Sequence, residues 1–230
     1  MGLIFRSCLA IVMVTSLCLN GCASSSIKAP DSCKSTLDSP IDRFCQVTQD
    51  VLWRGAKPDK VGAAWLIENE VRTIVNLELL HDDLAVIGQA HIKTAKTSKI
   101  GYFRVKDWEP LPVLAPSVED EHVVHFLAIA SQQVNQPVYV HCRSGQNRTG
   151  IMVAAFRIII EGRQDTEAVI EEMRAYQGLF SDVDAKYLQG LALRHSAILQ
   201  KVKEKIPRLE KPTQIICQEG KCAVELSSYR

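Results

Sequence analysis

Apolar and polar positions follow two different periods along the chain, and these periods predict an ordered series of strands and helices. Short runs rich in β-branched and other apolar residues predict strands at 50–55, 71–79, 101–105 and 137–141. Longer segments in which apolar residues recur on one helical face predict helices at 57–70, 82–95, 117–134, 149–161, 165–176 and 183–204. Strands that alternate with helices are typical of an α/β fold with a central, mostly parallel sheet flanked by helices.

The segment HCRSGQNRTG (141–150) begins where the strand 137–141 ends, which is where parallel sheets bind their ligands. The amide N–H groups of this short loop can converge on one anion, and the helix that follows adds its positive end. Gly145 removes a Cβ atom where the loop must turn tightly. Arg148 offers a charged, planar fork for two oxygens of that anion. The pattern therefore predicts an anion site.

Cys142 lies inside this loop, and its surroundings favour the thiolate over the thiol. A thiolate beneath a bound phosphate can attack phosphorus and form a cysteinyl-phosphate. Thr149 is placed to donate a hydrogen bond to the sulfur when the thiolate leaves. His141 is expected to orient the loop through its ring N–H groups.

Such a reaction needs an acid for the leaving oxygen and later a base for the attacking water. Asp107 in VKDWEP, on the loop after a predicted strand, is the first candidate. Glu109 on the same loop is its rival, and Asp120 and Glu121 are more distant ones.

The pattern His-Cys-x5-Arg-Thr-Gly resembles the signature of cysteine-dependent protein tyrosine and dual-specificity phosphatases. LWRGAKPD followed by WLIENEVRTIVNLE resembles the opening of the atypical dual-specificity branch, and the resemblance covers roughly residues 46–190. It implies the protein-tyrosine-phosphatase fold, with a phosphate-binding loop between a strand and a helix, no metal and no cofactor, and Cys142 as the nucleophile. The implied phosphate-binding residues are Arg143, Ser144, Gly145, Gln146, Asn147 and Arg148.

Two departures from the family pattern widen the choice of substrate. The Trp-Pro-Asp acid motif is only approximated by KDWEP, and no counterpart of the aromatic loop that deepens the pocket for phosphotyrosine is evident. A phosphotyrosine or dual-specificity phosphatase acting on a phosphorylated protein is one hypothesis, and an inositol polyphosphate phosphatase of the same mechanism is another. A catalytically inactive phosphate-binding surface module is a third, although the intact nucleophile and arginine argue against it. The Thr-Gly pair argues against a rhodanese-like sulfur transferase.

The first residues predict export. Arg6 precedes the apolar run CLAIVMVTSLCL, which is shorter than the roughly 20 residues that a membrane-spanning helix needs. The run ends in Leu-Asn-Gly-Cys (19–22), which resembles the lipobox of bacterial lipoproteins and implies that Cys22 is lipidated and anchors the protein to a membrane. The outer membrane or cell surface, facing the periplasm, is the expected location. The expected units are a signal peptide 1–21, a tether 22–45, a phosphatase domain 46–205 and a C-terminal hairpin 206–230.

The eight cysteines fit an oxidising compartment. QIICQEGKCAVEL predicts two strands around a turn at 219–220, with Cys217 facing Cys222 at a separation that suits a disulfide. Cys33 and Cys45 are a candidate second pair, although four cysteines allow three connectivities, and free thiols or a metal site are the alternatives.

Charge and histidine spacing exclude other classes of function. Lys and Arg total 27 against 26 Asp and Glu, and no basic stripe with interleaved aromatic residues is present, so no nucleic-acid partner is expected. His122 and His125 are three positions apart on a predicted helix, but the sequence shows no further ligands beside them, so no metal site is expected.

Overall fold

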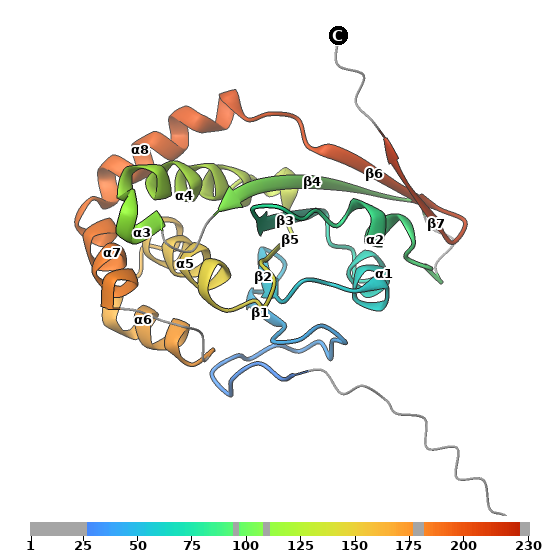
Figure 1. Ribbon diagram of the computed structural model, residues 1–230, viewed down its shortest axis with the longest axis horizontal. Helices are drawn as coiled ribbons and strands as arrows, with labels where there is room; N and C mark the ends of the chain where they lie inside the picture. The colour runs from blue at the N-terminus through green and yellow to red at the C-terminus, as the bar shows by residue number, and fades with distance from the viewer. Residues whose placement is uncertain (1–26, 94–96, 108–110, 177–181, 226–230) are drawn as a thin grey trace, which may run out of the picture.

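The computed structural model describes residues 27–93, 97–107, 111–176 and 182–225, and within them a seven-stranded sheet forms the centre of the fold (Figure 1). The strands lie in the order β1-β2-β5-β3-β4-β6-β7. Their bounds are β1 Cys45–Thr48, β2 Leu52–Gly55, β3 Thr73–Glu78, β4 Ser98–Asp107, β5 Val138–His141, β6 Thr213–Gln218 and β7 Lys221–Glu225. The four central strands are parallel, whereas β1 and the pair β6–β7 join antiparallel at the edges. The predicted α/β fold is confirmed, and its sheet is mixed.

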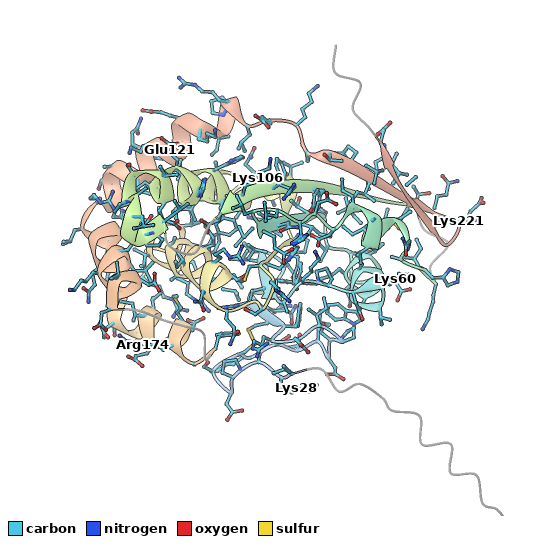
Figure 2. The ribbon with its side chains drawn as sticks, viewed as in Figure 1. Lys28, Lys60, Lys106, Glu121, Arg174 and Lys221 are labelled. Atoms are coloured by element: carbon cyan, nitrogen blue, oxygen red, sulfur yellow. A yellow bond between two sulfur atoms is a disulfide. The ribbon has the colours of Figure 1, made fainter. Side chains whose placement is uncertain are left out.

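Helices cover both faces of this sheet (Figure 1). On one face lie α1 Lys60–Glu68 and α2 Leu84–Gly88. On the other lie α3 Leu111–Leu114, α4 Pro116–Ala130, α5 Asn147–Ala155, α6 Thr166–Arg174, α7 Asp182–Leu193 and α8 His195–Lys205. Short helical turns η1 Gln133–Asn135, η2 Phe156–Ile160 and η3 Ile206–Arg208 complete the set. Charged side chains lie on many separate elements, as the labelled Lys28, Lys60, Lys106, Glu121, Arg174 and Lys221 show (Figure 2).

Two hydrophobic cores result from the alternation of side chains along the parallel strands. Val138 and Val140 of β5 pack into the core beneath α4 and α5, while Tyr139 between them packs into the core beneath α1. Ile74 and Val75 of β3 divide in the same way. Because successive side chains of a strand point to opposite faces, a strand buried on both sides must be apolar throughout.

The C-terminal hairpin extends the same sheet. β6 pairs with β4, and β7 pairs with β6. Glu219 and Gly220 both have positive φ, as a two-residue hairpin loop of type I′ requires. Cys217 and Cys222 are directly opposite in the ladder and form a disulfide.

Several predicted elements differ from the observed ones. The helix expected over 82–95 is only the short α2, because Gln89 ends it and no helix is found over the described residues 89–93. The helix expected over 183–204 is two helices, α7 and α8, separated at Arg194. The last turn of the helix expected over 149–161 is the π-helical η2. Strand β1 was not predicted.

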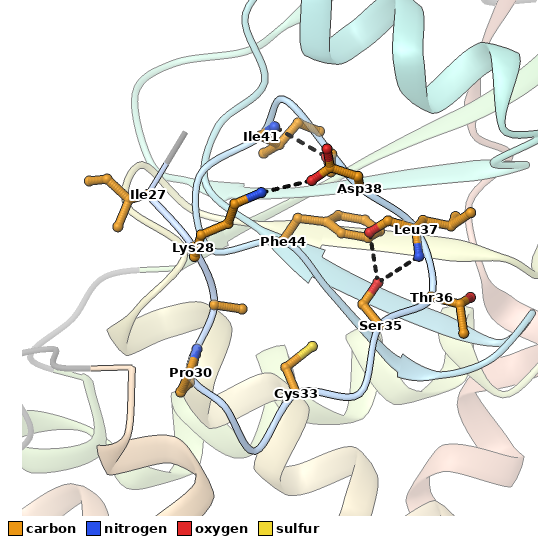
Figure 3. A pocket seen from close by; sticks show the side chains of 12 residues that line it. Ile27, Lys28, Pro30, Cys33, Ser35, Thr36, Leu37, Asp38, Ile41 and Phe44 are labelled. Carbon is orange, nitrogen blue, oxygen red and sulfur yellow. Dashed lines mark hydrogen bonds and ion pairs between the residues drawn. The ribbon is translucent and has the colours of Figure 1, made fainter. Parts of the chain in front are cut away.

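The segment before β1 packs on the domain rather than extending away from it. Ile41 and Phe44 are buried in the core beneath α1, and Cys33 forms a disulfide with Cys45. This segment lines its own pocket of about 320 Å³, across which Lys28 forms an exposed ion pair with Asp38 (Figure 3). The predicted tether 22–45 therefore ends well before residue 45.

Residues 1–26 lie outside the described part of the chain, and with them the predicted signal peptide and Cys22. Among the described residues, none of the helices has the length and apolar character needed to cross a bilayer.

We expect the Cys33–Cys45 disulfide to stabilise the packed N-terminal segment. Replacing both cysteines with alanine should lower the free energy of unfolding by about 3 kcal/mol, because an open loop of this size gains entropy in the unfolded chain. Urea unfolding of the oxidised proteins measures the loss. Reductant should destabilise the wild type more than the double variant; an equal effect on both would contradict the assignment.

Candidate active site

The loop 142–146 leaves the sheet at its centre. β5, which ends at His141, lies between β2 and β3. His141 is in register with Gly55, the last residue of β2, and with Asn76, two residues before the end of β3. α5 begins at Asn147, immediately after the loop. The sequence therefore places a strand end, a five-residue turn and a helix N-terminus at one point.

Four successive carbonyl groups of this loop are held by donors that lie outside it. The Arg143 carbonyl accepts from the Lys57 amide (3.2 Å), and the Ser144 carbonyl accepts from the Arg43 side chain (3.4 Å). The Arg54 side chain donates to the carbonyls of Gly145 (2.7 Å) and Gln146 (3.5 Å). The Gln146 carbonyl also accepts from the Gly150 amide (2.7 Å). The C=O and N–H groups of a planar trans peptide unit point in opposite directions. The amide N–H groups of residues 144–147 therefore point toward the inside of the loop, where they form a nest for an anion.

Gly145 makes this conformation possible. Its φ is +72°, a region that side chains disfavour. A Cβ atom at this position would lie 2.4 Å from the backbone carbon of Gly55 and 2.6 Å from the amide nitrogen of Ala56. The loop and the end of β2 are thus in direct backbone contact, and only glycine fits between them.

Arg54 is the residue that sequence reasoning missed at this site. It lies inside β2, is 1% exposed, and places its guanidinium 3.5 Å from the centre of the Tyr176 ring. Burial lowers its pKa from the ordinary value, while the charges of Tyr176 and Cys142 act in the opposite direction. A charged residue in the otherwise apolar stretch VLWRG was the available signal, because a buried arginine needs acceptors.

Cys142 begins the loop, and Arg148 lies just after it in the first turn of α5. Cys142 is a buried free thiol, 1% exposed. The Arg148 guanidinium donates from Nη1 to the carbonyl oxygens of Leu77 (3.2 Å) and Asp107 (3.4 Å). Since these carbonyls belong to the ends of β3 and β4, Arg148 links the loop to the strand that carries the predicted acid.

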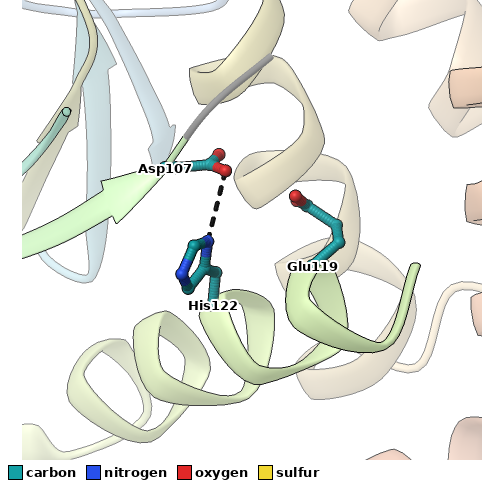
Figure 4. Close-up of side chains that lie close together, drawn as sticks. All are labelled: Asp107, Glu119 and His122. Carbon is teal, nitrogen blue, oxygen red and sulfur yellow. Dashed lines mark hydrogen bonds and ion pairs between the residues drawn. The ribbon is translucent and has the colours of Figure 1, made fainter. Parts of the chain in front are cut away.

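Asp107 is the last residue of β4 and its side chain is 1% exposed. Its Oδ1 lies 3.3 Å from His122 Nδ1, and the Glu119 carboxyl points toward the same place from α4 (Figure 4). One ligand-type atom from each of these three side chains lies within 4.8 Å of the other two. His122 therefore has acidic neighbours that sequence spacing did not reveal, while His125 is not part of the cluster.

The rival acids are placed elsewhere or not described. Glu109 lies outside the described residues. Asp120 accepts a hydrogen bond from Tyr187 (3.0 Å) and forms an ion pair with Arg194. Glu121 is exposed on α4. Of the candidates in the described part of the chain, only Asp107 contacts the loop arginine.

His141 contacts both the loop and a buried acid. Its Nδ1 lies 3.3 Å from the Cys142 carbonyl oxygen, and its Nε2 lies 3.0 Å from Asp83 Oδ2. Burial alone would raise the pKa of Asp83, but His141 and Lys57 outweigh it, so this pKa lies below its ordinary value. Asp83 also accepts a 2.7 Å hydrogen bond from Asn76.

Thr149 is fully buried in the first turn of α5. Its hydroxyl makes no hydrogen bond to Cys142 or to any other residue that the structure describes. Its contact with the sulfur stays a prediction.

The exposed Arg143 lies at the start of the loop, with its side chain open to solvent.

Comparison with protein families identifies this arrangement. A model of the family described as "DSP-PTPase phosphatase fused to NAD+ Kinase" matches residues 35–188, about two thirds of the chain. The chain belongs to this family.

Two curated proteins resemble this chain over part of their length. The dual specificity protein phosphatase TpbA of Pseudomonas aeruginosa strain UCBPP-PA14 is 33% identical over 134 residues, which are 58% of this chain and 53% of that protein. The chloroplastic NAD kinase 2 of Arabidopsis thaliana is 31% identical over 107 residues, 46% of this chain and 10% of that protein. The chain thus spans about half the length of the TpbA sequences it matches.

Solved structures of other proteins share the fold. The crystal structure of Pseudomonas aeruginosa TpbA has a TM-score of 0.50 and 26% identity, and it covers 76% of this chain and 98% of its own. The catalytic core of the PP-IP phosphatase Siw14 of Saccharomyces cerevisiae has a TM-score of 0.54 and 16% identity, and it covers 81% of this chain and 99% of its own. The protein-tyrosine-phosphatase-like fold is thereby confirmed.

We expect Gly145→Ala to lower phosphatase activity by about 100-fold or more, because the new Cβ atom must push the loop away from β2 and misplace its amides. Gly162→Ala is the matched control: Gly162 also has positive φ (+67°), but no atom lies within 4 Å of the added Cβ. The control should keep full activity and lose about 1 kcal/mol of stability. Equal activities of the two variants would contradict the role of the Gly145–Gly55 contact.

Proposed function

We propose that this protein hydrolyses phosphomonoesters through a cysteinyl-phosphate intermediate, as a protein tyrosine or dual-specificity phosphatase. The observation that carries the proposal is the loop whose carbonyls are held outward around Cys142. The loop amides would donate hydrogen bonds to a phosphate bound above the buried sulfur, and Arg148, which here donates to the Leu77 carbonyl at the end of β3, would supply positive charge.

In the first step the Cys142 thiolate attacks phosphorus. The S–P bond forms, the bond between phosphorus and the ester oxygen breaks, and Asp107 transfers its proton to that leaving oxygen. The loop amides hold the phosphoryl oxygens, and Arg148 neutralises the charge that they carry. The products of this step are an alcohol or phenol and the cysteinyl-phosphate.

In the second step Asp107, now ionised, accepts a proton from water. The water oxygen bonds to phosphorus, the S–P bond breaks, and inorganic phosphate and the Cys142 thiolate are released. The hydroxyl of Thr149, buried behind the loop, is proposed to stabilise the departing thiolate. The sum is one ester and one water converted to one alcohol and one phosphate.

Phosphotyrosine is the first substrate class to test, since the related TpbA was crystallised in complex with phosphotyrosine. Inositol polyphosphates are the alternative within the same chemistry. The exposed Arg143 at the start of the loop supports this alternative, because it offers a cation to further phosphate groups. An inactive phosphate-binding module would bind phosphate through the same loop amides but would not hydrolyse a phosphoester.

We expect Cys142→Ser to lower the rate of phosphate release by roughly 10³-fold or more, because the nucleophile is lost. Phosphate binding should persist, because the loop amides and Arg148 remain. The assay measures inorganic phosphate from phosphotyrosine peptide, phosphoserine peptide and inositol hexakisphosphate, with reductant present to keep the thiol free.

The preferred substrate separates the protein phosphatase from the inositol polyphosphate phosphatase. Turnover by Cys142→Ser equal to that of the wild type would rule out the cysteinyl-phosphate mechanism. Phosphate binding without release from any substrate would favour the inactive module.

We also propose that the protein is exported and anchored to a membrane through lipidated Cys22, facing the periplasm or the cell exterior. The lipobox-like stretch 19–22 supports this location. Two disulfides, Cys33–Cys45 and Cys217–Cys222, support it independently, because such bonds persist in oxidising compartments.

Cys22→Ala should abolish incorporation of labelled fatty acid and move the protein out of the membrane fraction, because the lipid would have no attachment point. Cys18→Ala, a cysteine four positions earlier in the same segment, is the control and should remain lipidated. Membrane association of Cys22→Ala at the wild-type level would overturn the anchor.

A further inference from the structure

Glu119 is a buried carboxyl group that the mechanism above does not use. It lies in the first turn of α4 and is 0% exposed. Neither of its oxygens accepts a hydrogen bond from the N–H and O–H donors of the described residues. An ionised carboxylate is very costly to bury without a donor, so this group must be neutral or must share a charge with a neighbour.

The neighbour is the proposed general acid. Glu119 points at Asp107, and the two carboxyl groups lie together with the His122 ring (Figure 4). Burial first, and then the charge and hydrogen bonding of Asp107, raise the pKa of Glu119 well above its ordinary range. The N-terminal position on α4 would favour an ionised carboxylate, but it acts against the stronger effect of burial beside a second acid.

We propose that Glu119 is a positioning residue for the general acid: its carboxyl group and that of Asp107 hold one proton between them, which keeps a proton available for the leaving oxygen at neutral pH. Two carboxyl groups at such close range cannot both ionise readily, so the pair retains a proton that a lone surface aspartate would lose. The catalytic role of the shared proton rests on the proposed function, whereas the existence of the shared proton does not depend on it.

The pair gives up its proton and regains it as the reaction proceeds. When Asp107 gives the shared proton to the leaving oxygen, both carboxyl groups are left ionised, and their mutual repulsion makes Asp107 a stronger base. Asp107 then takes a proton from the attacking water, and the pair returns to its starting state. No proton is gained or lost over the cycle apart from those of the products.

The other charged groups described around the pair come from three elements. Asp120 and His122 lie on α4 itself, Asp184 on α7, and Arg148 on α5, while Asp107 ends β4. The charges of Asp184 and Asp120 raise the pKa of Glu119 further. Asp120 is already paired with Arg194, so it is a buried acid of the same helix that has a different, structural partner.

The first test compares Glu119→Gln with Asp120→Asn in pH–rate profiles for two aryl phosphates, one with a good and one with a poor leaving group. Glutamine keeps the shape of glutamate but removes the second acid, so the two side chains can no longer share a proton. For the poor leaving group, we expect kcat to fall roughly tenfold to a hundredfold at neutral pH. The basic limb of the pH–rate profile, where activity falls with rising pH, should move about one pH unit lower.

The controls separate this effect from a loss of structure. With the good leaving group, which needs little protonation, Glu119→Gln should remain within a few fold of the wild type. Asp120→Asn removes only a weaker charge effect on Glu119, so it should shift the profile of the poor leaving group much less than Glu119→Gln does. An unchanged basic limb in Glu119→Gln, with Cys142-dependent turnover intact, would overturn the shared proton in catalysis while leaving the proposed function standing.

The second test needs no turnover. A group whose pKa is raised in the fold stabilises the fold fully below its unfolded-state pKa, and this contribution is lost as the pH rises through the folded-state value. Across the neutral range the wild type should therefore lose stability with rising pH, with the unfolding constant growing about tenfold per pH unit from this proton. Glu119→Gln should remove that slope, and Asp120→Asn should keep it.

Equal slopes in the wild type and Glu119→Gln would contradict the proposal even if no substrate were hydrolysed. Binding of a metal ion between the two carboxyl groups, in place of the shared proton, would also overturn the proposal. In that case a chelator would abolish activity, Zn²⁺ would restore it in the wild type, and Glu119→Gln would not respond to Zn²⁺. We expect the activity to be insensitive to the chelator.

Discussion

The hydrogen bonds that hold the loop carbonyls outward are the interaction on which the rest of the site depends. A short loop between a strand and a helix can expose either its carbonyls or its amides, and only the second arrangement binds an anion. Here the choice is made by β2 and its flanks, through Arg54, the Lys57 amide and Arg43. Arg54 can do this while buried because it stacks on Tyr176 and donates to two loop carbonyls. The catalytic loop is therefore shaped by residues that need not touch the substrate.

Much of the fold and the centre of the site could be predicted from the sequence, because both depend on local patterns. The apolar strand VYVH and the loop after it have a spacing that only a strand, a turn and a helix N-terminus satisfy. The hairpin at Glu219–Gly220 was predictable for the same reason, since both residues must adopt positive φ. The helix predicted over 82–95 shows the limit of periodicity, because α2 ends at Gly88 although buried apolar residues continue at Ala90 and Ile92.

What the sequence did not reveal was long-range pairing of polar groups. Glu119 and Asp107 are on different elements, and nothing in their spacing indicates that their carboxyl groups meet. Arg54 reaches acceptors 91 positions away. Such contacts follow from how helices and strands pack, which hydrophobic patterning fixes only approximately. The buried polar residues in apolar segments were visible in the sequence, but their partners were not.

The contact between Gly145 and Gly55 joins two parts of the chain that are synthesised far apart. The anion nest cannot exist in a partly folded chain, because β2, which shapes it, must first pair with β5, and the paired residues lie more than a third of the sequence apart. An anion that fits the nest therefore binds only the completed fold and, by mass action, shifts the folding equilibrium toward it. For this protein the substrate class would also act as a folding ligand, and the phosphate concentration around the chain would help to set how much of it is folded.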